Sequence, residues 1–197
     1  MAVRRVLAAC ALPLVLLACA GHRGPLPAPA ALLQEDPFDA HYKIHCDSST
    51  GNTVCVMTGN ALRPLSPRYP LLSLGLISEI DKAVQTKYFL RVLYVNEAQW
   101  LNIGPGNALT ITVDGTALAF AGGGSAGTRY TGEAGKVYET ARYETDAATI
   151  KMIARAKSVT VRVSGVSPLE KSFGSVNFLY FQQFIHHYVD KAPASGT

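Results

Sequence analysis

The segment around Asp114 and Gly115 limits most strongly what this chain can fold into. The five residues on each side, Leu109–Val113 and Thr116–Phe120, are mostly apolar or β-branched and have the length of a strand. An Asp-Gly pair favours a type I′ turn, because that turn needs positive φ at both central positions, and such a turn joins two antiparallel strands. The sequence therefore predicts a β-hairpin in the middle of the chain and favours a β-rich fold over a helical bundle.

Five more segments have the length and composition of β-strands. They are Tyr42–Cys46, Val54–Met57, Lys87–Val95, Val137–Glu144 and Ser158–Ser164. With the central hairpin they make about seven strands, which is enough for a sandwich or a strongly curved sheet. Residues 71–86 are ambiguous, and we expect a short helix near Ser78–Val84.

Two helices are predicted near the C-terminus. Asp146 is a suitable N-cap for a helix over Ala147–Ala156, because its carboxylate can accept hydrogen bonds from the first turn. From Asn177 to about Lys191, apolar side chains fall on one broad arc of a second helix. The arc contains Phe178, Phe181, Phe184, Ile185, Tyr188 and Val189, and the opposite arc contains Gln182, Gln183, His186, His187 and Asp190. We expect the apolar arc to pack on the sheet, although it could also contact a partner or a membrane.

Composition limits the fold class and the number of domains. The chain has 197 residues, of which 48% are hydrophobic and 16% are charged, and this excludes a disordered or fibrous chain. We expect an α+β fold that is mainly an antiparallel β-sandwich or curved sheet, with two packed helices near the C-terminus. Residues 41–191 should form a single globular domain, and residues 192–197 a disordered tail.

The first residues have the pattern of an export signal. Met1–Arg5 is short and basic, and Val6–Leu17 is an apolar run of twelve residues, too short to cross a bilayer as a permanent helix. The run ends in LLAC (residues 16–19), which resembles the lipobox of bacterial lipoproteins. The resemblance implies that the signal peptide, residues 1–18, is removed. It also implies that Cys19 receives a diacylglycerol on its sulfur and an acyl chain such as palmitate on its new amino group.

Two interpretations of the processing site remain open. If Cys19 is lipidated, residues 19–40 form a Pro- and Ala-rich tether that holds the domain away from the lipid surface. The resemblance then implies an outer-membrane address, because Ala20 follows the cysteine. Alternatively, ordinary signal peptidase cuts after Ala20 and releases a soluble periplasmic protein that begins at Gly21. We favour the lipoprotein, because a cysteine at the end of the apolar run would otherwise be a coincidence.

Cys46 and Cys55 are the two free thiols that either route leaves in the mature chain. If Thr50 and Gly51 are the loop residues of the first hairpin, the two cysteines face each other in a non-hydrogen-bonded pair. The close Cα atoms of such a pair suit a disulfide. A metal or redox pair is the weaker alternative, because the spacing is not Cys-x-x-Cys. We therefore expect a disulfide and an oxidising compartment.

The glycine-rich segment Gly122–Gly127 matches two catalytic patterns. It fits the G-x-G-x-x-G motif of dinucleotide-binding loops and the G-x-S-x-G motif around a hydrolase serine. Both motifs need a helix directly after the loop, but Thr128–Gly135 contains two glycines and no helical periodicity. Ser125, Asp146 and His186 have the chain order of a hydrolase triad. We nevertheless expect Ser125 to lie in a flexible loop between strands.

The histidines do not form a metal-binding pattern. His186 and His187 are adjacent and would diverge on a helix, whereas His41 and His45 would lie too far apart along a strand to bind one ion. Only the fold could bring these two pairs together. We predict no catalytic residue, no metal ligand and no cofactor.

The order of elements from residue 41 to residue 185 resembles small secreted bacterial β-sandwich proteins of the invasion-associated locus B type. The shared features are a cysteine-bearing first hairpin, a central hairpin at Ile111–Gly115, and a helix followed by a late strand and a closing segment. The resemblance implies the fold and a location in the cell envelope, and it implies no catalytic residues.

The expected function is that of a membrane-anchored envelope lipoprotein with a non-enzymatic binding or structural domain. Its expected partners are the membrane, through the lipid anchor at Cys19, and an envelope protein. Removal of Arg4 and Arg5 leaves two more basic than acidic residues, and so weak a charge predicts no nucleic-acid partner. The alternative is a periplasmic serine hydrolase that uses Ser125 with His186 or His187.

Overall fold

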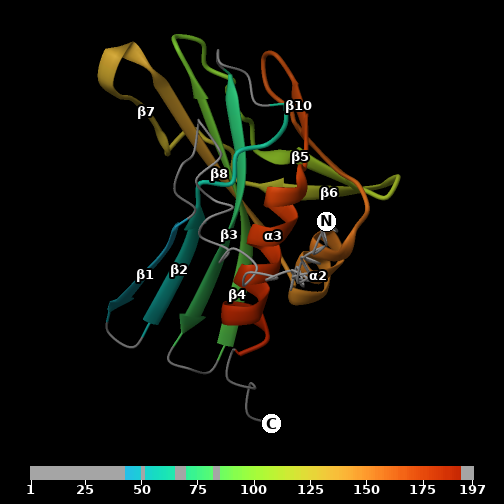
Figure 1. Cartoon of the computed structure of the whole chain (residues 1–197). Helices are drawn as coiled ribbons and strands as arrows, with labels where there is room; N and C mark the ends of the chain where they lie inside the picture. Colours follow the sequence, from blue (N-terminus) through green and yellow to red (C-terminus); the bar gives the residue numbers. More distant parts are fainter. Residues whose placement is uncertain (1–42, 50–51, 65–69, 82–84, 192–197) are drawn as a thin grey trace, which may run out of the picture.

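The computed structural model of the chain describes residues 43–49, 52–64, 70–81 and 85–191. In these residues the chain forms one antiparallel sheet of ten strands, with two α-helices towards its C-terminal end (Figure 1). The strand order is β1-β2-β3-β4-β8-β6-β5-β9-β10, and the short strand β7 pairs with β8. The expected α+β fold with a curved antiparallel sheet is confirmed.

The elements have the following bounds. The strands are β1 (Lys43–Ser49), β2 (Asn52–Thr58), β3 (Leu71–Asp81), β4 (Gln85–Asn96), β5 (Gly106–Val113), β6 (Thr116–Gly122), β7 (Arg129–Thr131), β8 (Val137–Thr145), β9 (Val159–Val163) and β10 (Leu169–Ser172). The helices are the 3-10 turn η1 (Glu133–Gly135), α2 (Ala147–Arg155), α3 (Ser175–Phe184) and the π-helical turn η2 (Ile185–Val189).

The seven strands expected from the sequence are all present. The hairpin of β5 and β6 turns at Asp114 and Gly115, whose φ angles of 47° and 89° are the positive values that a type I′ turn needs. Strands β3, β7 and β10 were not predicted from the sequence. Strands β7 and β10 have only three and four residues, which is too short to show a periodic pattern.

The short helix expected near Ser78 is wrong over the part that the structure describes, because Leu71–Asp81 forms strand β3. Residues 72–78 are all buried, so both faces of the strand are covered and its sequence shows no alternation. Glycine is required at position 75, because a Cβ atom there would lie 2.4 Å from the carbonyl oxygen of Met57. Residues 82–84, where the expected helix ended, lie outside the described residues.

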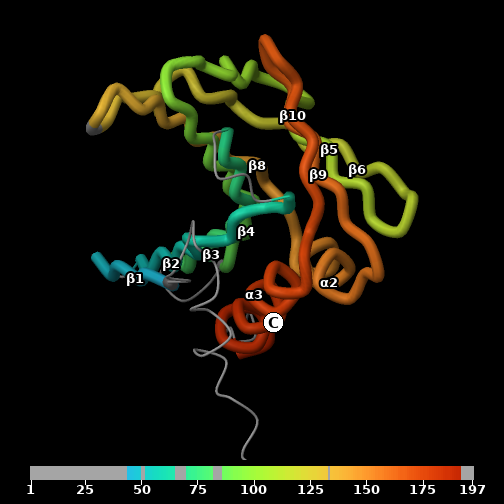
Figure 2. Tube along the Cα trace, turned by 45° about the horizontal axis from the view of Figure 1, so that its top comes forward, coloured from blue at the N-terminus to red at the C-terminus, as the bar shows by residue number. Residues whose placement is uncertain are grey.

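The hydrophobic core lies on the concave side of the bent sheet. Figure 2 shows α2 and α3 in the bend between β4 and β9. The buried side chains of β3 and β4 that face this side lie opposite one another across the two strands. The pairs are Leu72 with Tyr94, Leu74 with Val92, and Leu76 with Leu90. One cluster of buried residues runs from Met57 to Val189.

Helix α2 forms where the sequence predicts it. The Asp146 carboxylate accepts a 2.8 Å hydrogen bond from the backbone N–H of Thr149, which satisfies one of the free donors of the first turn. Ile150, Ile153 and Ala154 are buried on one side. The helix therefore begins at a side-chain cap and is held by its apolar side.

The last helix is confirmed, although it begins at Ser175 rather than at Asn177 and changes to a π-helical turn at Ile185. Four residues of the predicted apolar arc are buried and two are half-buried, whereas His186 and His187 are exposed. The buried residues are Phe181, Phe184, Ile185 and Val189, and the half-buried ones are Phe178 and Tyr188. Tyr180, which the predicted arc lacked, is also buried.

The segment Asn60–Arg63, between β2 and β3, connects distant parts of the sheet. Ala61 forms a β-bridge with Ser73 of β3, and Arg63 forms one with Ser172 of β10. Arg63 and Ser172 exchange two backbone hydrogen bonds of 2.7 Å each. The chain thus ties β3 to β10, which lies at the far end of the strand order.

Truncation of Phe181 tests the packing of the last helix. Phe181 has no exposed surface, so Phe181→Ala should lower the free energy of unfolding by about 3–5 kcal/mol. His187→Ala, on the exposed side of the same helix, should change it by less than about 0.5 kcal/mol. Thermal and urea unfolding of the two variants measures both changes. A stable Phe181→Ala variant beside a destabilised His187→Ala variant would mean that the helix faces the other way.

Candidate functional site

The side of β2, β3, β4 and β8 that faces away from the helices carries several charged and aromatic side chains. We call this side the outer face. Because side chains alternate along a strand, burial of Leu90 and Val92 towards the helices places Phe89 and Arg91 on the outer face. Arg142 of β8 lies opposite Arg91. The outer face is therefore built by the same alternation that builds the core.

Arg142 organises the centre of the outer face. Its guanidinium forms an ion pair with Glu79 of β3 and lies 4.3 Å from the centre of the Phe89 ring. This cation–π contact covers one side of an aromatic ring that is only half-buried. Burial lowers the pKa of the neighbouring Arg91 guanidinium from its ordinary value, and the interaction with Tyr130 opposes this shift.

A pair of tyrosines extends the outer face onto the β7–β8 hairpin. The rings of Tyr130 and Tyr138 stack in parallel with their centres 4.8 Å apart. Tyr130 is 57% exposed although it is large and aromatic. Exposed aromatic rings beside arginine are typical of protein surfaces that bind another molecule.

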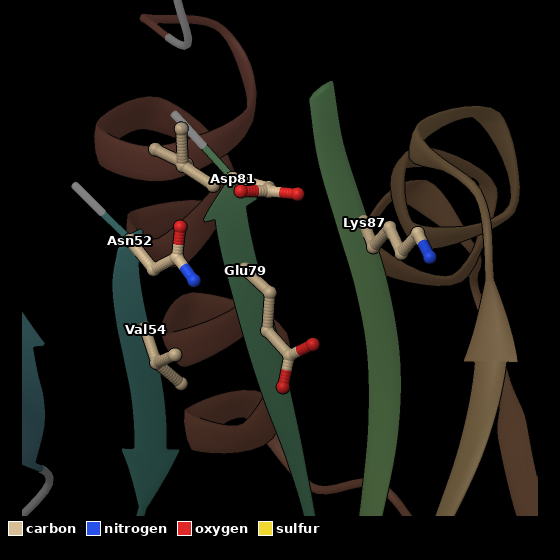
Figure 3. A pocket seen from close by; sticks show the side chains of 6 residues that line it. Asn52, Val54, Glu79, Asp81 and Lys87 are labelled. Atoms are coloured by element: carbon tan, nitrogen blue, oxygen red, sulfur yellow. The ribbon is translucent and has the colours of Figure 1, made fainter. Parts of the chain in front are cut away.

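A shallow hollow of about 280 Å³ lies at the end of the outer face. Figure 3 shows Glu79 and Asp81 on β3, with Asn52 and Val54 on β2 to one side and Lys87 on β4 to the other. Glu79 pairs across the strands with both Val54 and Lys87. The side chains that line the hollow include hydrogen-bond donors and acceptors as well as apolar groups. None of these lining residues is a Ser, Cys or His, so the hollow has no pair of nucleophile and base of that kind.

Ser125 lies in a different part of the fold and is buried. Its Oγ donates a 2.6 Å hydrogen bond to the Glu139 carboxylate and contacts the carbonyl oxygen of Ile103 at 3.3 Å. His186 and His187 are exposed on η2 and are not among these partners. After the glycine-rich loop the chain continues into β7, so the helix that both catalytic motifs need does not follow.

Glu139 is a buried ionisable residue that was not singled out from the sequence. Its carboxylate has no exposed surface, yet it accepts backbone hydrogen bonds from three successive residues in addition to the one from Ser125. The donors are the N–H groups of Leu101, Asn102 (2.9 Å) and Ile103 (3.1 Å). The signal was present in the sequence, because Glu139 shares the inward side of β8 with Val137, Ala141 and Tyr143.

The role of the Glu139 carboxylate is to hold two loops together. It fixes the loop between β4 and β5 and, through Ser125, the loop after β6. Arg129 of β7 also contacts the loop between β4 and β5. Its guanidinium donates a hydrogen bond to the side chain of Asn102, and its Cζ lies 5.8 Å from the centre of the Trp100 ring. A buried carboxylate with four donors is a structural anchor, since its lone pairs are already occupied.

The first hairpin contains the disulfide that the sequence predicts. Cys46 lies opposite Cys55, their Cα atoms are 4.1 Å apart, and the two sulfurs are bonded. The bond leaves neither thiol free to ligate a metal in this structure. The hydroxyl of Tyr188 on η2 lies 3.7 Å from the sulfur of Cys46, so the hairpin also contacts the last helix.

His186 and His187 lie against each other, whereas His45 lies on a different element of the fold. His45 is exposed on the side of β1 opposite to Cys46, whereas His186 and His187 lie on η2 with their ring centres 4.9 Å apart. In the part of the chain that the structure describes, no group of three His, Cys, Asp or Glu residues is placed to hold a metal ion. His41 and Cys19 lie outside that part. Among the described helices none has the length and apolar character needed to cross a bilayer.

Comparison with known protein families, characterised proteins and solved structures found no match for this chain.

Ser125→Ala separates a structural role of this serine from a catalytic one. Loss of a hydrogen bond to a buried charged group should lower the free energy of unfolding by about 1.5–3 kcal/mol, whereas Ser167→Ala at an exposed position should change it by less than about 0.5 kcal/mol. Urea unfolding measures both. We also expect a fluorophosphonate probe to leave the wild-type protein unlabelled. Labelling that disappears in Ser125→Ala would contradict the structural role.

Proposed function

We propose that this chain is a membrane-anchored envelope lipoprotein whose domain binds another envelope component without catalysis. The observation that carries the proposal is the LLAC sequence at residues 16–19, directly after an apolar run of twelve residues. The run is too short for a permanent transmembrane helix and ends at the cysteine that lipidation requires.

The composition of the next segment supports the anchor. Residues 20–42 separate Cys19 from β1, which begins at Lys43, and their first part alternates proline with small residues. In this proposal the segment is the spacer between the lipid anchor and the domain. Two or three acyl chains on Cys19 would hold the protein stably, whereas one chain binds a membrane only marginally.

The outer face supports binding as the task of the domain. It combines the half-buried Phe89, the exposed Tyr130 and the guanidinium groups of Arg91 and Arg142 on rigid strands. Aromatic and arginine side chains supply most of the binding energy of protein interfaces, and strands hold them in fixed positions. We propose an envelope protein as the partner of this face.

The enzymatic alternative has less support. A serine nucleophile needs a general base within hydrogen-bonding distance and access for a substrate. Ser125 is 1% exposed, and its hydroxyl proton is directed at the carboxylate of Glu139. That carboxylate also accepts three backbone hydrogen bonds, which favour its role as an anchor.

Lipidation is tested with the full chain expressed in a Gram-negative bacterium. We expect the wild type to partition into detergent and to carry diacylglycerol and acyl mass on an N-terminal Cys19, and Cys19→Ala to lose both properties. Cys10→Ala is the matched control, because Cys10 lies in the same apolar run and is removed with the signal peptide. A soluble wild-type protein that begins at Gly21 would contradict the anchor and support ordinary signal-peptidase cleavage.

A further inference from the structure

Strand β1 is an exposed edge of the sheet. It pairs with β2 on one side, and no described strand pairs with its other side. Residues 45–49 are exposed along it. The other end of the strand order is different, because β10 is bridged to Arg63 through Ser172. An edge strand of seven residues presents unpaired backbone donors and acceptors to any second strand that approaches it.

The disulfide shows which backbone groups point outwards. Cys46 and Cys55 lie opposite each other with Cα atoms 4.1 Å apart, which is the close spacing of a non-hydrogen-bonded pair. In an antiparallel ladder the hydrogen bonds to the neighbour alternate with those that point away from it. The N–H and C=O groups of Ile44, Cys46 and Ser48 are therefore directed to the open side of β1, and the disulfide holds this edge firmly on β2.

We infer that β1 pairs in antiparallel fashion with β1 of a second copy of this chain, across a two-fold axis at Cys46. This register pairs all seven residues of the strand and lets the outward-facing groups of the two central cysteines hydrogen-bond with each other. A two-fold axis also makes the interface self-complementary, as in most homodimers.

The side chains of β1 favour this register through their charges. His45 of each copy lies opposite Asp47 of the other, and both pairs lie on the side of the strand away from the disulfide. An imidazole N–H can donate to a carboxylate whether the ring is neutral or charged. A register centred on His45 instead places the two imidazoles opposite each other and pairs only residues 43–47.

The charge pattern gives a test in which two defective variants repair each other. His45→Asp alone places carboxylates opposite carboxylates, and Asp47→His alone places imidazoles opposite imidazoles. When the two variants are mixed, each mixed dimer again contains two imidazole–carboxylate pairs. A merely structural defect in either strand would not be repaired by mixing.

The experiment uses the full chain, purified in a mild detergent and studied by sedimentation at matched solvent density. We expect the wild type to form dimers, and we expect the dimer of each variant alone to have a dissociation constant about tenfold higher. The mixture of the two variants should recover the wild-type affinity as heterodimers, which are detected through two different tags. Circular dichroism and an intact Cys46–Cys55 bond check that both variants fold.

Two outcomes overturn the inference. One is a wild type that stays monomeric up to several hundred micromolar, and the other is dimers of unchanged affinity in both variants. The same series in a Cys19→Ala background separates this inference from the proposed function, since pairing through β1 does not depend on lipidation. Loss of the lipid with retained dimers would leave the inference intact.

Discussion

The hydrogen bonds made by two buried asparagines, Asn60 and Asn177, join parts of this domain that are far apart in sequence. Asn177 Nδ2 donates to Asn60 Oδ1 at 2.7 Å and to the carbonyl oxygen of Ala61 at 2.8 Å. Asn60 Nδ2 donates to the carbonyl oxygen of Leu74 at 2.6 Å. Asn177 also accepts the N–H of Gly174, directly before α3. The first turn of α3 is thereby fixed to strand β3 and to the segment that reaches β10. Buried amides are costly when unpaired, so this arrangement specifies one position of the helix.

Local sequence signals predicted the elements whose cause is local. The Asp114–Gly115 turn, the Asp146 cap and the opposition of Cys46 and Cys55 each depend on residues a few positions apart, and each is present. The amphipathic arc of the last helix was visible for the same reason, because burial of Phe181 and exposure of His187 follow from helical spacing alone.

Features that depend on distant residues were not predictable in the same way. Strand β3 was missed because it is covered on both faces, and its cover comes from other strands and from the segment around Met57. The donors to Glu139 lie 36 or more positions away along the chain, or 14 positions in the case of Ser125. The position of Glu139 on the same side of β8 as the apolar residues could have indicated a buried carboxylate. It could not have indicated which loops that carboxylate would hold.

The two sides of the sheet differ in the groups that they leave accessible. Core residues fill the concave side, and the buried Glu139 carboxylate there is occupied by donors of the protein itself. The outer face and the β1 edge keep charged, aromatic and backbone groups accessible on strands that cannot easily move.

A double-mutant cycle on Asn60 and Asn177 tests most directly whether their contact fixes the last helix to the sheet. The free energy of unfolding is measured for the wild type, Asn60→Ala, Asn177→Ala and the double variant. We expect the two single losses to be non-additive, with an interaction energy of about 1–2 kcal/mol. Additive losses, with an interaction energy near zero, would contradict the account.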